Sequence, residues 1–234
     1  WVVSYFLGKQ SKNKLQLKYM KLKLNLVKRI TTLGLPGFFL QLASSLLNAT
    51  LNKNLFLYGG DIAVSGMGVI NSIQTLLLMP IVGLNQGAQP IISFNYGAGK
   101  FDRAKEAVKL AIKTATIIVT SGFIVTRLFP VQLISLFNRD PDLIDFGRSA
   151  IFAWFLCFPV VGFQVVAANF FQAIGRPKSS MFLTLTRQLI LLIPAIMVFP
   201  KLWGLKGLLY AAPFADFLSF LLTAVFFYFG MKRL

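Results

Sequence analysis

Long runs of uncharged, mostly apolar residues alternate along this chain with short connections that carry lysine and arginine. The longest run without a charged residue extends from Ile62 to Gly99, which is 38 positions. One crossing of a lipid bilayer takes about 20 residues of helix, so this run is longer than a single crossing needs. The pattern predicts membrane-spanning helices joined by short polar connections.

The apolar runs predict six such helices, at residues 33–51, 62–94, 113–129, 148–174, 179–200 and 205–230. The second helix is longer than the others and contains Pro80 and Pro90, and we expect it to break between them. Residues 33–234 are therefore predicted to form an all-α integral membrane bundle of six transmembrane helices.

Composition agrees with a membrane protein, since 56% of the residues are hydrophobic, the mean hydropathy is +0.70 and only 13% are charged. The net charge of +17 would suit a nucleic-acid partner, but most lysines and arginines lie in connections between apolar runs, which argues against one. They concentrate before the first helix, after the second and fourth, and at the end of the chain. The positive-inside rule then predicts a multi-pass plasma membrane protein with both ends of this chain in the cytoplasm.

The first 32 residues differ from the rest. Residues 1–8 form an apolar octet that is too short to cross a bilayer, and a lysine-rich stretch follows it. The octet is interpreted as the end of a preceding transmembrane helix whose start is missing from this chain. The basic stretch is interpreted as a cytoplasmic linker that sets topology, and the alternative is an amphipathic helix on anionic lipid.

Enzymatic chemistry finds no support in the residues. The chain has one cysteine, Cys157, and no histidine, so no disulfide within it and no histidine-based metal site or general base is expected. The glycine-rich phosphate loops GxGxxG and GxxxxGK[ST] are absent. We expect no enzyme activity and no cofactor, and we expect an ion gradient to supply energy.

Polar residues recur on two of the predicted helices with helical spacing. Amides inside a membrane helix face a cavity or bond a neighbouring helix, and the sequence leaves both interpretations open for each residue. For the two sets together we favour the wall of a substrate cavity. The candidates are Gln41, Ser44, Ser45 and Asn48 on the first helix, and Asn71, Gln74, Asn85 and Gln89 on the second.

Arg187 and Asp216 are charged residues well inside apolar runs on consecutive helices. An unpaired charge there is costly, so the two are predicted to pair. The pair is either structural or, alternatively, Asp216 titrates or binds a cation during transport.

Several segments of the chain carry recognisable motifs, and they are GLPGF, GGDIAVSGMGVINSIQTLLLMP, GLNQGAQPIISFNYGAGKFDRAKEAVKLA, LFNRDPDLIDFG, FFQAIGRPKSS, TRQLILLIP and PFADFLSFLLTA. In this order they resemble the multidrug and toxic compound extrusion (MATE) family of secondary exporters, and the second segment resembles its MepA-type branch. The resemblance implies twelve helices in two lobes, of which this chain would be the carboxyl-terminal lobe and the missing amino-terminal lobe its partner.

The resemblance also implies efflux of amphipathic, often cationic drugs or toxins by antiport of H+ or Na+, in contact with membrane lipid. In one branch of the family, carboxylates on the seventh and tenth helices help to bind the coupling cation. Here the matching part of the first helix has Gln41, Ser44 and Ser45, and residues 148–174 contain no acid, so such a site is not expected. The alternative function is a flippase for lipid-linked oligosaccharide, from the same superfamily.

Overall fold

The computed structural model describes residues 23–232, and the predictions for residues 1–22 lie outside this range. The chain divides into two units, residues 1–39 and 40–234, and each is described by itself. In the first unit the described residues from Leu24 onward are helical, so a helix begins inside the segment predicted as a linker. Its role as a linker between lobes stays a prediction.

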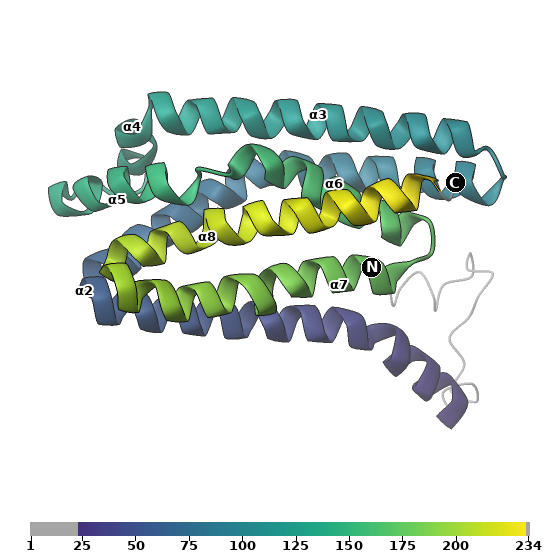
Figure 1. The fold of residues 1–234 in the computed structure, drawn as a ribbon, viewed down its shortest axis with the longest axis horizontal. Coiled ribbons are helices and arrows are strands. Elements are labelled where there is room, and N and C mark those ends of the chain that lie inside the picture. The colour runs from purple at the N-terminus through teal and green to yellow at the C-terminus, as the bar shows by residue number, and fades with distance from the viewer. Residues whose placement is uncertain (1–22, 233–234) are drawn as a thin grey trace, which may run out of the picture. The chain divides into compact units, whose positions relative to one another are not determined.

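The described residues are almost entirely helical, and no strand occurs among them. The predicted all-α membrane fold is confirmed. The elements are α2 (Leu24–Gly97), α3 (Phe101–Leu128), α4 (Pro130–Ser135), α5 (Pro141–Trp154), α6 (Phe158–Ala173), α7 (Pro177–Leu185), a π-helix η2 (Thr186–Leu192) and α8 (Ile193–Lys232) (Figure 1).

Two glycines divide the longest helices. Gly60 in α2 has φ 65° and ψ −162°, and Gly204 in α8 has φ 59° and ψ −145°. Only glycine adopts this part of backbone space readily, because a side chain there would collide with the backbone. At Gly204 the chain turns back on itself, so that the two parts of α8 run side by side in opposite directions (Figure 1).

Three helical stretches of the described residues are long and apolar enough to cross a membrane, Gly37–Gly97, Phe101–Leu128 and Pro177–Lys232. The bent pair of α5 and α6 would make a fourth. Division of the first and third stretches at Gly60 and Gly204 brings the number of crossing segments close to the predicted six.

Two of the predicted helices differ in detail. The break expected between Pro80 and Pro90 was wrong, because α2 stays helical from residue 61 to Gly97. The fourth predicted helix is instead broken, since α5 and α6 meet at an angle of 56°. Pro159 explains this bend, because its ring lacks an N–H and would collide with the carbonyl of Phe155 in a continuous helix.

The start of α3 and the cap of α5 show how local chemistry sets helix ends. Helix α3 begins at Phe101, twelve residues before the predicted start, with Asp102 in its first turn, where a negative charge favours the helix dipole. At the start of α5 the carboxylate of Asp140 accepts hydrogen bonds from the backbone N–H groups of Asp142, at 2.9 Å, and Leu143, at 3.5 Å. The Asp140 side chain therefore caps the first turn of α5.

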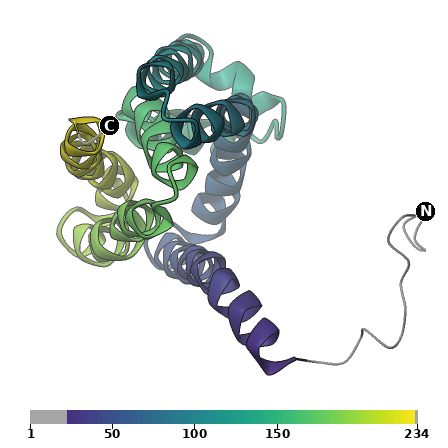
Figure 2. The same cartoon turned by 90° about the vertical axis from the view of Figure 1, so that its right-hand side faces the viewer.

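Small residues allow the helices of residues 40–234 to pack closely into a bundle (Figure 2). Helix α3 buries Ala111, Ala115 and Val119 along one face, and this face packs against α6. A Cβ added to Gly162 of α6 would lie 3.0 Å from the carbonyl oxygen of Ala115, so the two backbones nearly touch. Such contacts are typical of helix packing in membranes, where van der Waals contact replaces the hydrophobic effect.

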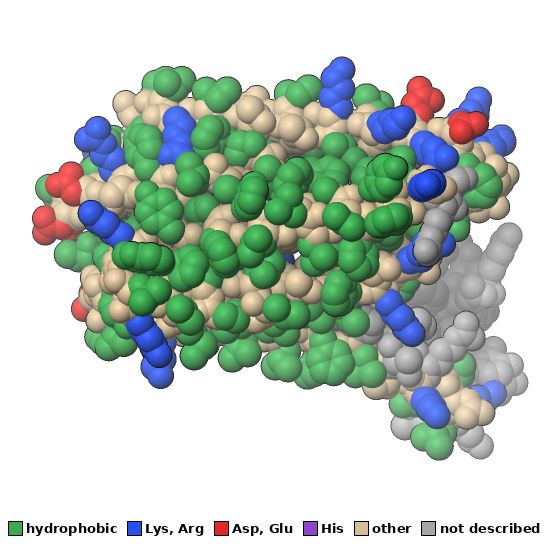
Figure 3. Space-filling model, viewed as in Figure 1, with side chains coloured by type: hydrophobic (Ala, Val, Ile, Leu, Met, Phe, Trp, Pro, Cys, Tyr) green, Lys and Arg blue, Asp and Glu red, His purple; other side chains and the backbone are tan. Residues whose placement is uncertain are grey.

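Large apolar side chains cover the middle of the bundle surface, and charged side chains gather toward its two ends (Figure 3). Exposed apolar side chains occur on several helices, among them Phe56, 62% exposed, Leu110, 64% exposed, and Phe229, 55% exposed. Exposed apolar surface on this scale would aggregate in water and fits a lipid environment.

We predict that Gly204→Ala destabilises the protein by about 1–3 kcal/mol, because alanine must adopt the conformation that favours glycine. A lower melting temperature of the detergent-solubilised protein would report this change. Gly68→Ala is the matched control, since Gly68 is helical, exposed and has no atom within 4 Å of an added Cβ. Equal melting temperatures for the two variants would contradict the prediction.

Candidate functional site

The first part of α2 exposes two different surfaces on neighbouring faces. Gln41, Ser45, Asn48 and Asn52 are exposed and lie within about 60° of one another around the helix, and we call them the first polar face. The exposed leucines Leu42, Leu46 and Leu57 lie about 90–150° from the centre of this face. The helix therefore offers lipid one side and keeps a polar strip beside it.

The second part of α2 exposes small and polar residues on one side, interspersed with apolar ones such as Leu76 and Phe94. Asn71 and Gln89 lie half-buried at the edge of this surface, and Met79 and Val82 are exposed within it. We call the small and polar exposed residues the second polar face, and they are Ser65, Gly68, Ser72, Thr75, Gly83 and Gln86.

Three of the eight candidate cavity residues bond other helices instead. The Gln74 side-chain oxygen accepts a hydrogen bond from the indole N–H of Trp154 at 3.0 Å. The buried Asn85 accepts from the amide of Asn169 through its side-chain oxygen at 3.3 Å. The hydroxyl of Ser44 accepts from the amide of Gln188 at 3.3 Å and donates to the backbone of Leu40. These three side chains therefore link helices in this structure, and a cavity-lining role for them stays a prediction.

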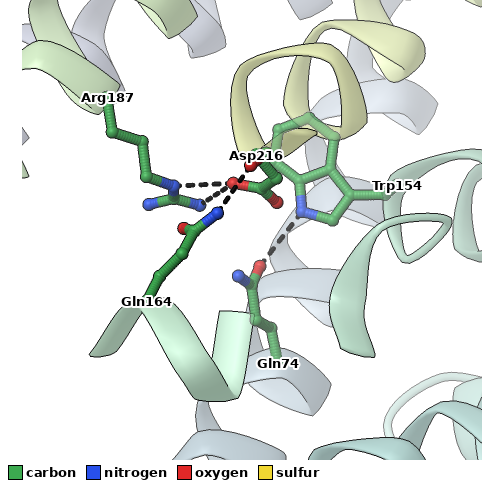
Figure 4. A network of polar contacts seen from close by, with 5 residues as sticks. All are labelled: Gln74, Trp154, Gln164, Arg187 and Asp216. Atoms are coloured by element: carbon green, nitrogen blue, oxygen red, sulfur yellow. Dashed lines mark hydrogen bonds and ion pairs between the residues drawn. The ribbon is translucent and has the colours of Figure 1, made fainter. Parts of the chain in front are cut away.

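The structure places Arg187 and Asp216 in direct contact, on η2 and α8 (Figure 4). The guanidinium group donates to one carboxylate oxygen of Asp216 through Nε and through Nη2, each at 2.6 Å. The Asp216 side chain is only 7% exposed, whereas that of Arg187 is 26% exposed. The pair neutralises both charges, which is the condition for keeping them inside an apolar bundle.

Gln164 of α6 joins this pair, and the sequence patterns had not singled it out. Its side-chain amide donates to the backbone oxygen of Asp216 at 2.5 Å, and the side chain is buried (Figure 4). It is an uncharged polar residue in an apolar run, which is the signal that identified Asn71 and Gln89. The same signal could have identified Gln164.

Arg187 lies in a π-helical turn, which no sequence pattern had indicated. The wider turn interrupts the regular hydrogen-bond ladder, and π-turns inside α-helices occur frequently at functional sites. The Thr186 hydroxyl and the Gln188 side-chain oxygen are buried there without a hydrogen-bond partner. Unpaired buried polar atoms lower the free energy of unfolding, so this turn is a locally destabilised part of the bundle.

Comparison with known proteins identifies the family. The family model described as MatE matches residues 36–197, which is more than half of the chain. The chain belongs to the MATE family. The predicted family membership is thereby confirmed, and members of this family are transporters rather than enzymes.

Individual MATE relatives show how much of a transporter the chain covers. The FAD transporter of Shewanella oneidensis is 28% identical over 190 residues, which are 81% of this chain and 42% of that protein. The multidrug export protein MepA of Staphylococcus saprophyticus is 24% identical over 233 residues, which are 99% of this chain and 51% of that protein. The chain spans about half the length of these relatives.

Solved MATE structures resemble the fold closely. The MATE multidrug transporter DinF-BH is 37% identical with a TM-score of 0.79, and the match covers 97% of this chain and 51% of that one. A MATE transporter solved in an inward-facing conformation reaches a TM-score of 0.85 at 21% identity, and the match covers 99% of this chain and 54% of that one. The second likeness concerns the fold alone.

We predict that Asn85→Leu destabilises the protein by about 1–3 kcal/mol, because it removes the side-chain hydrogen bond to Asn169 and leaves that amide only its longer contact, 3.4 Å, with the backbone oxygen of residue 85. Asn48→Leu is the matched control, since Asn48 is exposed and has no described hydrogen bond. The measurement is the melting temperature in detergent. A loss of stability at Asn48 as large as that at Asn85 would contradict the distinction between exposed and bonded amides.

Proposed function

We propose that the chain is the carboxyl-terminal lobe of a MATE exporter that expels amphipathic, often cationic small molecules by antiport of H+ or Na+. The two polar faces of α2 carry this proposal. The hydroxyls of Ser72 and Thr75 donate to the backbone of their own helix. The exposed amides of these faces have no described hydrogen bond, and hydrocarbon would leave them without a partner. The faces therefore require a water-filled cavity or a second lobe, and the match to half of each relative's length supports both.

The residues proposed to contact substrate are those candidates that form no described hydrogen bond with another helix. Gln41, Ser45 and Asn48 are exposed, and Asn71 and Gln89 lie half-buried at the edge of the second polar face. Small residues beside them, the glycines of the second polar face, leave room for a substrate. Gln74, Asn85 and Ser44 take the supporting role of holding helices together.

A flippase for lipid-linked oligosaccharide is the second candidate. Such a protein needs positive charge that is free to meet phosphate, and the charge of Arg187 is neutralised by Asp216. This observation favours the exporter. The relative named FAD transporter makes flavins a class to include among the compounds assayed.

The orientation proposed is with both ends of this chain in the cytoplasm. Lys100 and Arg103 at the start of α3 and Lys178 at the start of α7 lie at one end of the bundle, close to the hydrogen bond that joins Ser93 to the backbone of Ala173. The connection between α4 and α5, which contains Arg139, lies at the opposite end (Figure 1). The larger number of basic residues at the first end supports a cytoplasmic location for it.

We predict that Asn48→Leu, Asn71→Leu and Gln89→Leu each change the set of compounds exported without a matching loss of protein from the membrane. The physical reason is that each side chain would contact substrate and would not hold another helix. Drug and flavin export from cells, normalised to the amount of transporter, is the measurement. Leu46→Val on the apolar side of the same helix is the control. Export that only follows protein abundance would show that these amides have a packing role.

We predict that cysteines replacing Lys100 and Lys178, in a Cys157→Ser background, resist a membrane-impermeant thiol reagent added outside intact cells. A cysteine replacing Arg139 should react, because the proposed orientation places it outside. Permeabilised cells provide the control, since all three positions should then react. External labelling at Lys100 would refute the orientation.

A further inference from the structure

A small cavity, open to the surface of the bundle, adjoins the ion pair on one side. Its volume is about 100 Å³, and side chains from α6, α7, η2 and α8 line it. A buried water needs only about 10–15 Å³ on this measure, so the cavity has room for several. The polar residues that line it are Gln164, Thr184, Arg187, Ser219 and Thr223.

Three residues with hydroxyl groups line this cavity, and each hydroxyl can form a hydrogen bond that no described protein group supplies. Ser219 is 3% exposed and Thr223 is 2% exposed, and neither side chain has a described hydrogen bond. Thr184 uses its proton to bond the backbone of Ser180, so its oxygen remains free to accept. Polar groups in these surroundings are satisfied by water or by a donor that enters the cavity.

Asp216 is the one buried acid among the described residues, since the six others are exposed. Arg187 is the charged group that touches it, and Cys157 at the bend between α5 and α6 is a titratable group with an electrostatic interaction with it. The other polar neighbour is the uncharged Gln164. The charge state of Asp216 is therefore linked closely to the position of Arg187.

We propose that the cavity is a water-filled second position for the Arg187 guanidinium, which it occupies when Asp216 takes up a proton. Hydronium donates the proton to the carboxylate oxygen, a water molecule is released, and the neutral carboxylic acid no longer holds the arginine. The guanidinium then donates to water and to the free oxygens of Thr184, Ser219 and Thr223. Loss of the proton to water reverses these steps and restores the pair.

The physical argument rests on the cost of an unpaired buried charge. If Arg187 had no other partner, it would stay paired with Asp216, because an unpaired guanidinium in an apolar bundle is strongly unfavourable. The cavity lowers this cost by supplying hydrogen-bond partners next to the guanidinium. The π-turn that carries Arg187 adds a local backbone arrangement with unpaired buried groups, which is suited to rearrangement.

The cavity also has a direction. Thr184 lies one turn before Arg187 on the path from Pro177, and Thr223 lies two turns beyond Asp216 toward Lys232. Both displacements lead from the ion pair toward the end proposed as cytoplasmic. Proton exchange on that side would give the lobe a coupling step of its own, a role that rests on the proposed ion antiport.

The test is a pH titration of the purified two-lobe transporter, followed by the infrared carbonyl band of protonated carboxyl groups. Asp216→Asn should remove one component of this band. Ser219→Ala and Thr223→Val should weaken proton binding at Asp216 about tenfold, which moves the midpoint of that component down by about one pH unit. The sign follows because these variants destabilise only the protonated state, in which Arg187 needs the cavity.

Controls separate this role from a structural one. Thr223→Ser keeps the hydroxyl and should keep the wild-type midpoint. Thr120→Val removes a hydroxyl from α3, away from the cavity, and should also leave the midpoint unchanged. In an Arg187→Gln background the cavity variants should no longer move the midpoint, because they act through Arg187. If Thr223→Val fails to fold, Ser219→Ala alone decides the outcome.

An unchanged midpoint in the cavity variants would overturn the proposal, and so would an equal shift with and without Arg187. The titration uses no substrate and no ion gradient, so its outcome is independent of export. Export with no Asp216 component in the titration would leave the proposed function in place and reject this inference. If the wild-type transporter showed the expected titration but exported nothing, this inference would stand and the proposed function would be rejected.

Discussion

Hydrocarbon offers no hydrogen-bond partner to a polar group, and the arrangement of residues 40–234 follows from this constraint. Helices satisfy their backbone internally, which accounts for the absence of strands in the described part of the chain. Backbone that leaves the helical conformation does so at glycines or beside a proline, at Gly60, Gly204 and the bend before Pro159. Most polar side chains inside the bundle bond another side chain or the backbone, and the Thr186 hydroxyl and the Gln188 oxygen in the π-turn are exceptions.

The contact between Arg187 and Asp216 is the costliest instance of this constraint. Separately each charge would oppose insertion into the bilayer, and together they link η2 to α8, with Gln164 adding α6. The partial exposure of Arg187 distinguishes this contact from a fully buried ion pair. One side of the guanidinium meets a cavity with unpaired hydroxyls, so a structural pair and a movable one are compatible with the same geometry.

The polar faces of α2 present the opposite situation, since their hydrogen-bonding groups stay largely unsatisfied by other helices of residues 40–232. A soluble protein would hydrate them without consequence. On a helix that also exposes Leu42 and Leu46 to lipid, they indicate a neighbour or a cavity that this chain does not supply by itself. The second lobe that we propose would meet that requirement, and alternating access by movement of one lobe against the other would suit a polar interface between them.

The order of apolar runs, the basic connections and the family motifs were sufficient to determine the all-α membrane fold, the family and most of the crossing segments. These features depend on local composition and on helix length, which a sequence states directly. The pairing of Arg187 with Asp216 could also be expected, because an intramembrane charge requires a partner and the two helices are consecutive.

Tertiary structure alone decided which polar residues bond other helices and which remain exposed. Asn48 and Asn85 are the same residue type, yet Asn48 is exposed and Asn85 bonds Asn169 of α6. The continuity of the second part of α2 through Pro80 and Pro90, the π-turn at Arg187 and the cavity beside it likewise depend on packing between helices distant in sequence. Helical periodicity assigns a residue to a face, but only the neighbouring helices determine what that face meets.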